Sequence, residues 1–165
     1  MLHYVVGGTF ATLIGTNLLH DLVVGTLGIM YSSTSFVRHG SESNKVIDKV
    51  RKDIAKLDIT IKLELVKTLM NNLPINDITK VIENGLVELM FKIKSVIDWI
   101  DYEIAKHQEK WFSGYRAINF EDKIDELSDL VIILDGRITL LMNVCKNDSK
   151  NECKNDVIGK DVDTK

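Results

Sequence analysis

The sequence predicts an all-α protein in which an N-terminal transmembrane-like hydrophobic helix precedes an antiparallel, coiled-coil-like bundle of three helices. Residues 1–37 contain no Lys, Arg or Glu and one Asp, whereas the chain that follows is strongly charged. In that later part, apolar residues recur at alternating steps of three and four, which is the period of an amphipathic helix. A single Pro and an aromatic content of 7% also favour helices over an all-β fold.

Residues 1–37 are predicted to be a membrane anchor. A helix needs about 20 apolar residues to cross the hydrocarbon core, and the run from Tyr4 to Tyr31 is longer and has an aromatic residue at each end, as interfacial segments often do. His20 and Asp21 interrupt it near the middle. A buried Asp costs about 2.5–3.5 kcal/mol, which the surrounding apolar residues can offset.

Two other interpretations of this segment stay open. The run can divide at His20–Asp21 into a re-entrant hairpin or an interfacial insertion, or it can be a segment buried inside a soluble protein or an assembly. Small residues at four-residue spacing also favour close helix packing. The residues assigned to the anchor and its packing face are Gly7, Ala11, Gly15, His20 and Asp21.

The charges that flank the anchor predict its orientation. Basic residues follow the anchor, beginning with Arg38, and no Lys or Arg precedes it. The positive-inside rule therefore predicts a single-pass protein with its bulk on the cytosolic or virion-interior side. Candidate residues for the membrane interface are Tyr4, Tyr31, Arg38, Trp111, Phe112 and Tyr115.

Residues 38–43 form a predicted linker, and two amphipathic helices are predicted over 44–71 and 76–113. Pro74 separates them, because the residue before a proline is disfavoured in a helix. The apolar stripe of the first helix comprises Ile47, Val50, Ile54, Leu57, Ile61 and Leu65. That of the second comprises Ile82, Leu86, Leu89, Ile93, Val96, Ile100, Ile104 and His107.

The third helix is predicted over 119–146, with Asn119 as its N-cap. Gly136 lies inside it and costs about 1 kcal/mol of helix propensity. Its apolar residues follow an unbroken heptad pattern. This bundle seam comprises Phe120, Ile124, Leu127, Val131, Leu134, Ile138 and Leu141.

Residues 147–165 alternate Lys with Asp and Glu and are predicted to be a disordered tail. The two cysteines, Cys145 and Cys153, do not have a zinc-binding spacing, and a reduced cytosolic pair is expected.

No pattern in the sequence predicts catalysis. There is no phosphate-binding loop, nucleophile elbow or dinucleotide fingerprint. Glu103 and His107 share a helical face, but a metal site needs at least three ligands. A net charge of −3 and a pI near 5.8 argue against a nucleic-acid partner. We therefore expect no enzyme activity, cofactor, metal or small-molecule substrate.

These features predict a membrane-anchored structural or interaction protein that links a bilayer to a protein assembly, for example as a minor structural component of a large viral particle. The expected partners are the bilayer, other proteins that bind through helical faces, and further copies of the chain. The alternative is an oligomeric membrane-perturbing or channel-like protein that uses the glycine-rich anchor with His20 and Asp21.

Overall fold

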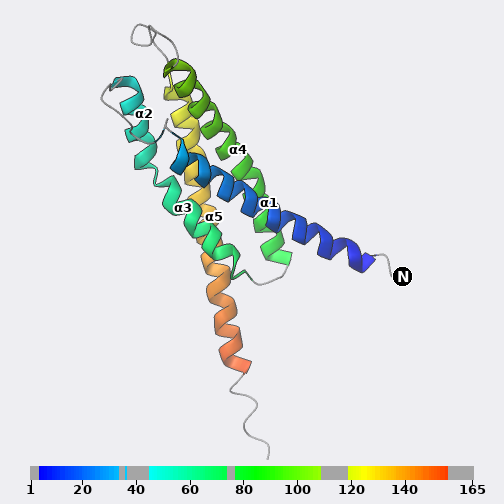
Figure 1. The fold of residues 1–165 in the computed structure, drawn as a ribbon. Helices are drawn as coiled ribbons and strands as arrows, with labels where there is room; N and C mark the ends of the chain where they lie inside the picture. The colour runs from blue at the N-terminus through cyan, green and yellow to red at the C-terminus, as the bar shows by residue number, and fades with distance from the viewer. Residues whose placement is uncertain (1–3, 34–35, 37–44, 74–76, 109–118, 156–165) are drawn as a thin grey trace, which may run out of the picture.

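The protein is a bundle of helices, which confirms the all-α prediction (Figure 1). The computed structural model describes residues 4–33, 36, 45–73, 77–108 and 119–155, and it describes side-chain surroundings from Asn17 to Lys146 within these ranges. The described residues form no strand. The helices are α1 (Tyr4–Ser32), α2 (Lys45–Lys56), α3 (Ile59–Met70), α4 (Asp77–Gln108) and α5 (Glu121–Asn155).

Helix α4 packs against α1 on one side and against α5 on the other. It runs antiparallel to α3 and α5, and α1 crosses over α3 and α4 (Figure 1). The predicted stripe of α4 is fully or nearly fully buried from Ile82 to His107. Met90 and Ile97 widen this stripe, so that α4 has enough apolar surface to pack against both α1 and α5.

Helix α1 is part of the bundle, which differs from the predicted arrangement of a separate anchor and a three-helix domain. Leu19, Val23, Thr26 and Leu27 are buried, and this half of α1 packs against α3 and α4. These residues recur at steps of three and four, so one face of the helix meets the bundle. In the described part of the chain, no helix combines the length and apolar character needed to cross a bilayer, and the transmembrane prediction is therefore unsupported.

The helix predicted over 44–71 is divided into α2 and α3. Asp58 adopts a left-handed conformation with φ 51° and ψ 32°, a region that Asp tolerates better than most residues. The last turn of α2 is tightened by a bond from the Leu57 N–H to the Ile54 carbonyl, and the Lys62 N–H bonds to the Asp58 carbonyl as α3 begins. The backbone direction therefore changes between the two helices.

This break corrects the predicted stripe of the first helix. Ile61 is 67% exposed and Leu65 is also exposed, although both were assigned to the core. The kink turns a different face of α3 inward. The residues that it buries are Ile59, Leu63, Val66 and Met70.

Helix α5 carries the predicted seam into the core. Phe120, Leu127, Val131, Leu134, Ile138 and Leu141 are buried, and Ile124 is partly buried against them. The Asn119 side-chain oxygen accepts a hydrogen bond from the Glu121 N–H at 2.9 Å, which satisfies one N–H of the first turn. The helix continues to Asn155, so the part of the predicted disordered tail from 147 to 155 is helical.

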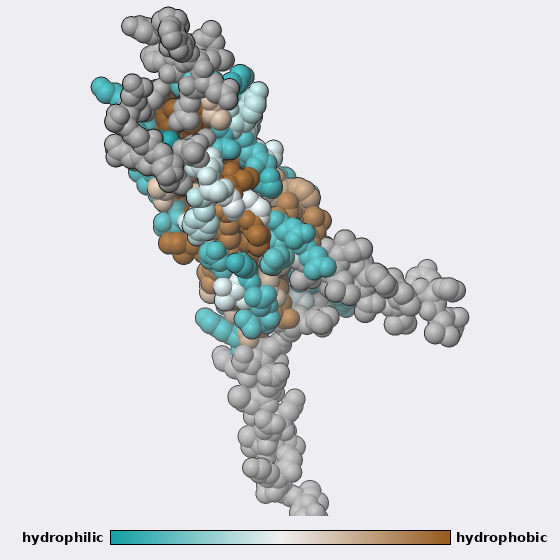
Figure 2. Space-filling model, viewed as in Figure 1, coloured by the Kyte–Doolittle hydropathy of each residue, from teal (hydrophilic) through white to brown (hydrophobic). Residues whose placement is uncertain are grey.

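On the face drawn in Figure 2, apolar side chains reach the surface among polar ones over the middle of the bundle. Exposed apolar side chains of α3 and α4 include Ile61 and Phe91. The outer surface of the bundle is therefore not uniformly polar.

The seam gives a test of the fold. Leu134 is fully buried and its neighbour Ile133 is 49% exposed. Leu134→Ala should lower the free energy of unfolding by about 2–5 kcal/mol, because it opens a cavity in the core. Ile133→Ala should change it by no more than about 0.5 kcal/mol. Urea denaturation followed by circular dichroism at low protein concentration measures both, and equal effects would show that α5 packs in another register.

Candidate functional site

The first candidate site is the point at which α1 leaves the bundle. Toward its N-terminus α1 runs out beyond the other helices (Figure 1). Asn17, His20 and Asp21 are exposed around this point, and His20 Nδ1 lies 3.7 Å from Asp21 Oδ1. Because Leu19 and Leu22 beside them are buried, the two faces of the helix differ sharply here.

The C-terminal end of α1 is fixed to the bundle by polar contacts as well as by packing. The Ser33 hydroxyl donates a hydrogen bond to Asp101 of α4. Within the helix, the Thr26 hydroxyl donates to the Leu22 carbonyl at 2.7 Å, which satisfies a buried polar group. This half of α1 is thus held in a defined position.

The predicted membrane-interface residues are only partly placed. Tyr31 is 59% exposed near the end of α1, and Tyr4 is the first residue of that helix. Gly7, Ala11 and Gly15 lie on the α1 backbone, in the part whose side-chain surroundings are not described. Arg38, Trp111, Phe112 and Tyr115 lie outside the described residues.

The second candidate site is a groove of about 640 Å³ between α2 and the start of α5. Its apolar lining comes from both helices, and polar side chains surround it. The apolar residues are Val46, Val50, Leu57, Phe120 and Ile124, and the polar ones are Lys45, Lys49, Asp53, Lys56, Asn119, Glu121, Asp125 and Ser128.

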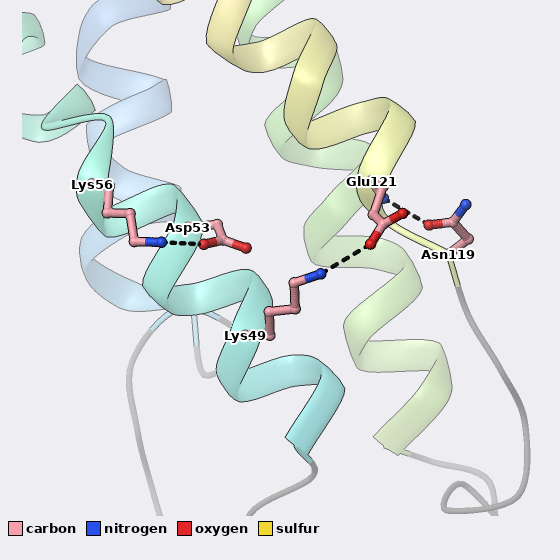
Figure 3. A network of polar contacts seen from close by, with 5 residues as sticks. All are labelled: Lys49, Asp53, Lys56, Asn119 and Glu121. Atoms are coloured by element: carbon pink, nitrogen blue, oxygen red, sulfur yellow. Dashed lines mark hydrogen bonds and ion pairs between the residues drawn. The ribbon is translucent and has the colours of Figure 1, made fainter.

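Two ion pairs lie along this groove (Figure 3). Lys49 Nζ on α2 lies 2.9 Å from Glu121 Oε1 on α5, so this pair joins the two helices. Lys56 Nζ lies 2.7 Å from Asp53 Oδ1 within α2. Exposed pairs of this kind contribute little to stability, and their main effect is to set the positions of charges around the groove.

The two pairs shift the pKa values of Lys49 and Asp53. The hydrogen bond and the charge of Glu121 raise the pKa of Lys49 above 10.5. The hydrogen bond from Lys56 lowers the pKa of Asp53 below 3.8. Each shift favours the charged form, so the lysine and the carboxylate stay ionised over a wide range around neutral pH.

The groove has the composition of a binding surface. Its apolar lining with charges of both signs at its edge suits an amphipathic segment. Among the described residues, no group of three or more His, Cys, Asp or Glu side chains is placed to hold a metal ion.

The structure gives no metal-binding arrangement to the candidate ligands that it describes, which are Glu103, His107 and Cys145. Glu103 Oε1 lies 3.2 Å from Lys106 Nζ, and His107 is buried at the end of α4. Cys145 Sγ lies 3.9 Å from the Asn72 carbonyl oxygen. Cys153 lies beyond the described side chains.

The groove was not predicted from the sequence. Lys49 and Glu121 are 72 residues apart, and nothing in their local spacing indicates that they meet. The alternation of charges on the outer face of α2 was visible, but it is typical of any solvated helix.

Comparisons with protein-family models, with curated proteins and with solved structures found no match.

The Lys49–Glu121 pair makes a prediction about pH. Because Glu121 raises the pKa of Lys49, the pair stabilises the fold below pH 10.5 and its contribution is lost as pH rises through the raised value. Glu121→Gln should bring the pKa of Lys49 back down toward 10.5. A lysine-detected NMR titration measures this, with Asp122→Asn as the matched control because Asp122 is exposed on the same turn. Equal shifts in both variants would contradict a specific pair.

The contribution of the Asp53–Lys56 pair to stability depends on pH in the opposite direction. Its contribution to stability is present above pH 3.8 and is lost as pH falls through the lowered pKa of Asp53. Lys56→Met should raise that pKa toward 3.8, measured by a carboxyl-detected NMR titration. An unchanged value would show that the pair does not form in solution.

Proposed function

We propose that this chain is a non-enzymatic structural and interaction protein that attaches to a membrane surface through the N-terminal half of α1. The bundle then presents its outer helical faces to other proteins. The observation that carries the proposal is the division of α1 into a half packed in the core, with Leu19 and Val23 at 0% exposure, and an uncharged half that runs out beyond the bundle (Figure 1).

The length of the projecting half favours insertion over spanning. From Tyr4 to Thr16 the helix extends about 20 Å at 1.5 Å per residue, whereas a hydrocarbon core is about 30 Å thick. Such a segment reaches into one leaflet and part of the next. This is partial insertion from one side of the bilayer, and its strength depends on the buried apolar area.

The polar residues at the junction support the same placement. Asn17, His20 and Asp21 are exposed where α1 enters the bundle, so they would lie at the level of the headgroups when the apolar half is inserted. The chain has a net charge of −3. We therefore expect binding that depends weakly on anionic lipid and on salt, because attraction to anionic headgroups requires a basic cluster.

The surface of the bundle supports binding to other proteins. Exposed apolar side chains on α3 and α4, such as Ile61 at 67% and Val81 at 70% exposure, offer contacts to partner proteins. A membrane-proximal layer of a large viral particle is one setting in which such a protein would serve.

Vesicle flotation tests the attachment. The full chain should float with phosphatidylcholine vesicles, and Phe10→Asp with Ile14→Asp should abolish flotation, since each charge in the apolar phase costs about 2.5–3.5 kcal/mol. The matched control is Val24→Asp, on the exposed face of the packed half of α1, which should float like the wild type. Loss of flotation in the control, or its persistence in the double variant, would overturn the proposal.

The channel-like alternative makes a separate prediction about Asp21. If copies of α1 surrounded a pore lined by His20 and Asp21, the full chain would release protons across vesicles, and Asp21→Leu would stop the leak. The proposed attachment predicts no leak from the wild type and unchanged flotation of Asp21→Leu. Fluorescence of a pH-sensitive dye trapped in the vesicles distinguishes the two functions.

A further inference from the structure

The outward face of α5 carries an apolar ridge. Ile132 is 65% exposed, Ile133 is 49% exposed and Leu140 is 51% exposed, and Gly136 between them is also exposed. Ile132, Ile133 and Leu140 each lie three or four positions from Gly136, so they share its face of the helix. We refer to them together as the α5 ridge.

The contacts on either side of Gly136 show that the ridge points directly away from the bundle. Asp135 Oδ2 lies 2.7 Å from Lys62 Nζ of α3. On the other side, the Arg137 guanidinium lies over Gly85 of α4. Successive helical residues are about 100° apart around the helix axis. Asp135 therefore turns toward α3, Arg137 turns toward α4, and Gly136 between them faces away from both.

The glycine at the centre of the ridge is not required by the fold of one chain. Gly136 lies at an ordinary helical position within α5, and its φ is not in the left-handed range. A Cβ placed on it would meet nothing within 4 Å. Glycine in mid-helix weakens the helix, but it permits close approach by another backbone.

We propose that the α5 ridge is a self-association surface on which a second copy of the chain packs antiparallel, with its two-fold axis at Gly136. The proposal concerns a different surface from the membrane-attached half of α1 and does not depend on it.

The order of residues along α5 favours this occupant, because positions equally far before and after Gly136 are complementary. In a two-fold antiparallel pair, a residue four positions after Gly136 lies level with the residue four positions before it in the second copy. Leu140 then packs beside Ile132 and Ile133 of the second copy, as a knob into a hole. The interface is self-complementary, as two-fold symmetry requires.

The polar residues farther along the ridge fit the same register. Asn143 lies level with Asp129 of the second copy, and both residues are exposed. The pairing places an amide opposite a carboxylate. A parallel pair would instead place each charge opposite itself, which is unfavourable.

The size of the contact sets its expected strength. From Asp129 to Asn143 the face is about 21 Å long at 1.5 Å per residue. A single helical ridge covers less surface than the roughly 1,200 Å² that stable complexes bury. We therefore expect a dimer that dissociates on dilution.

Sedimentation equilibrium of the full chain carrying Phe10→Asp and Ile14→Asp tests the dimer without association through α1. The mass should rise with concentration from 18.7 kDa toward twice that value. Leu140→Asp should weaken association at least tenfold, and Gly136→Leu should do the same while the helix content is kept or increased. A monomer at all concentrations, or variants that associate as strongly as their parent, would overturn the proposal.

Cysteine cross-linking tests the register in chains that carry Cys145→Ser and Cys153→Ser. Gly136→Cys should form a disulfide-linked dimer with itself, because the two-fold axis brings the two positions together, whereas Lys52→Cys on exposed α2 should not. Mixed Ile132→Cys and Leu140→Cys chains should cross-link to each other. Preferential self-linking of Leu140→Cys would indicate a parallel pair and would overturn the antiparallel assignment.

Discussion

The fold depends on the wide apolar face of α4, which two other helices share. Leu86, Ile93 and Ile100 are fully buried along one line, and Met90 and Ile97 extend the buried surface around the helix. A stripe this wide cannot be covered by α5 alone. Helix α1 supplies the remaining cover, because its buried residues other than Thr26 are apolar and it packs against α3 and α4. The bundle is therefore completed by the segment whose sequence least resembles that of a soluble helix.

The sequence was sufficient to predict which face of a helix is buried where one face is apolar and the other is charged. The seam of α5 and the stripe of α4 lie in the core as their spacing predicts, since only one orientation buries their apolar residues and leaves most of their charged residues in water. It was insufficient for α1, in which nearly every position is uncharged. A helix that is apolar all round has no pattern to distinguish burial in protein from burial in lipid, and only the contacts made by Val23 and Leu27 decide for that half.

Helix α3 illustrates a second limit. Its sequence contains two interleaved apolar lines, one through Ile61 and Leu65 and the other through Leu63 and Val66, and either can face a core. The choice depends on the left-handed residue Asp58, and an Asp, although it tolerates this conformation, does not by itself mark a break in a helix. The groove between α2 and α5 follows from the same break, because α2 is turned relative to α3 and meets α5 through the Lys49–Glu121 pair. Neither could be predicted from spacing alone.

The continuity of α1 has a mechanical consequence. The same unbroken helix is fixed in the core by Val23 and Leu27 and extends outward to Tyr4, with no flexible joint between the two parts. An α-helix of this length resists bending. A structure that binds the outer end of α1 would therefore also set the tilt of the entire bundle. The helix would act as a rigid connection that fixes the orientation of the bundle, and not as a flexible tether.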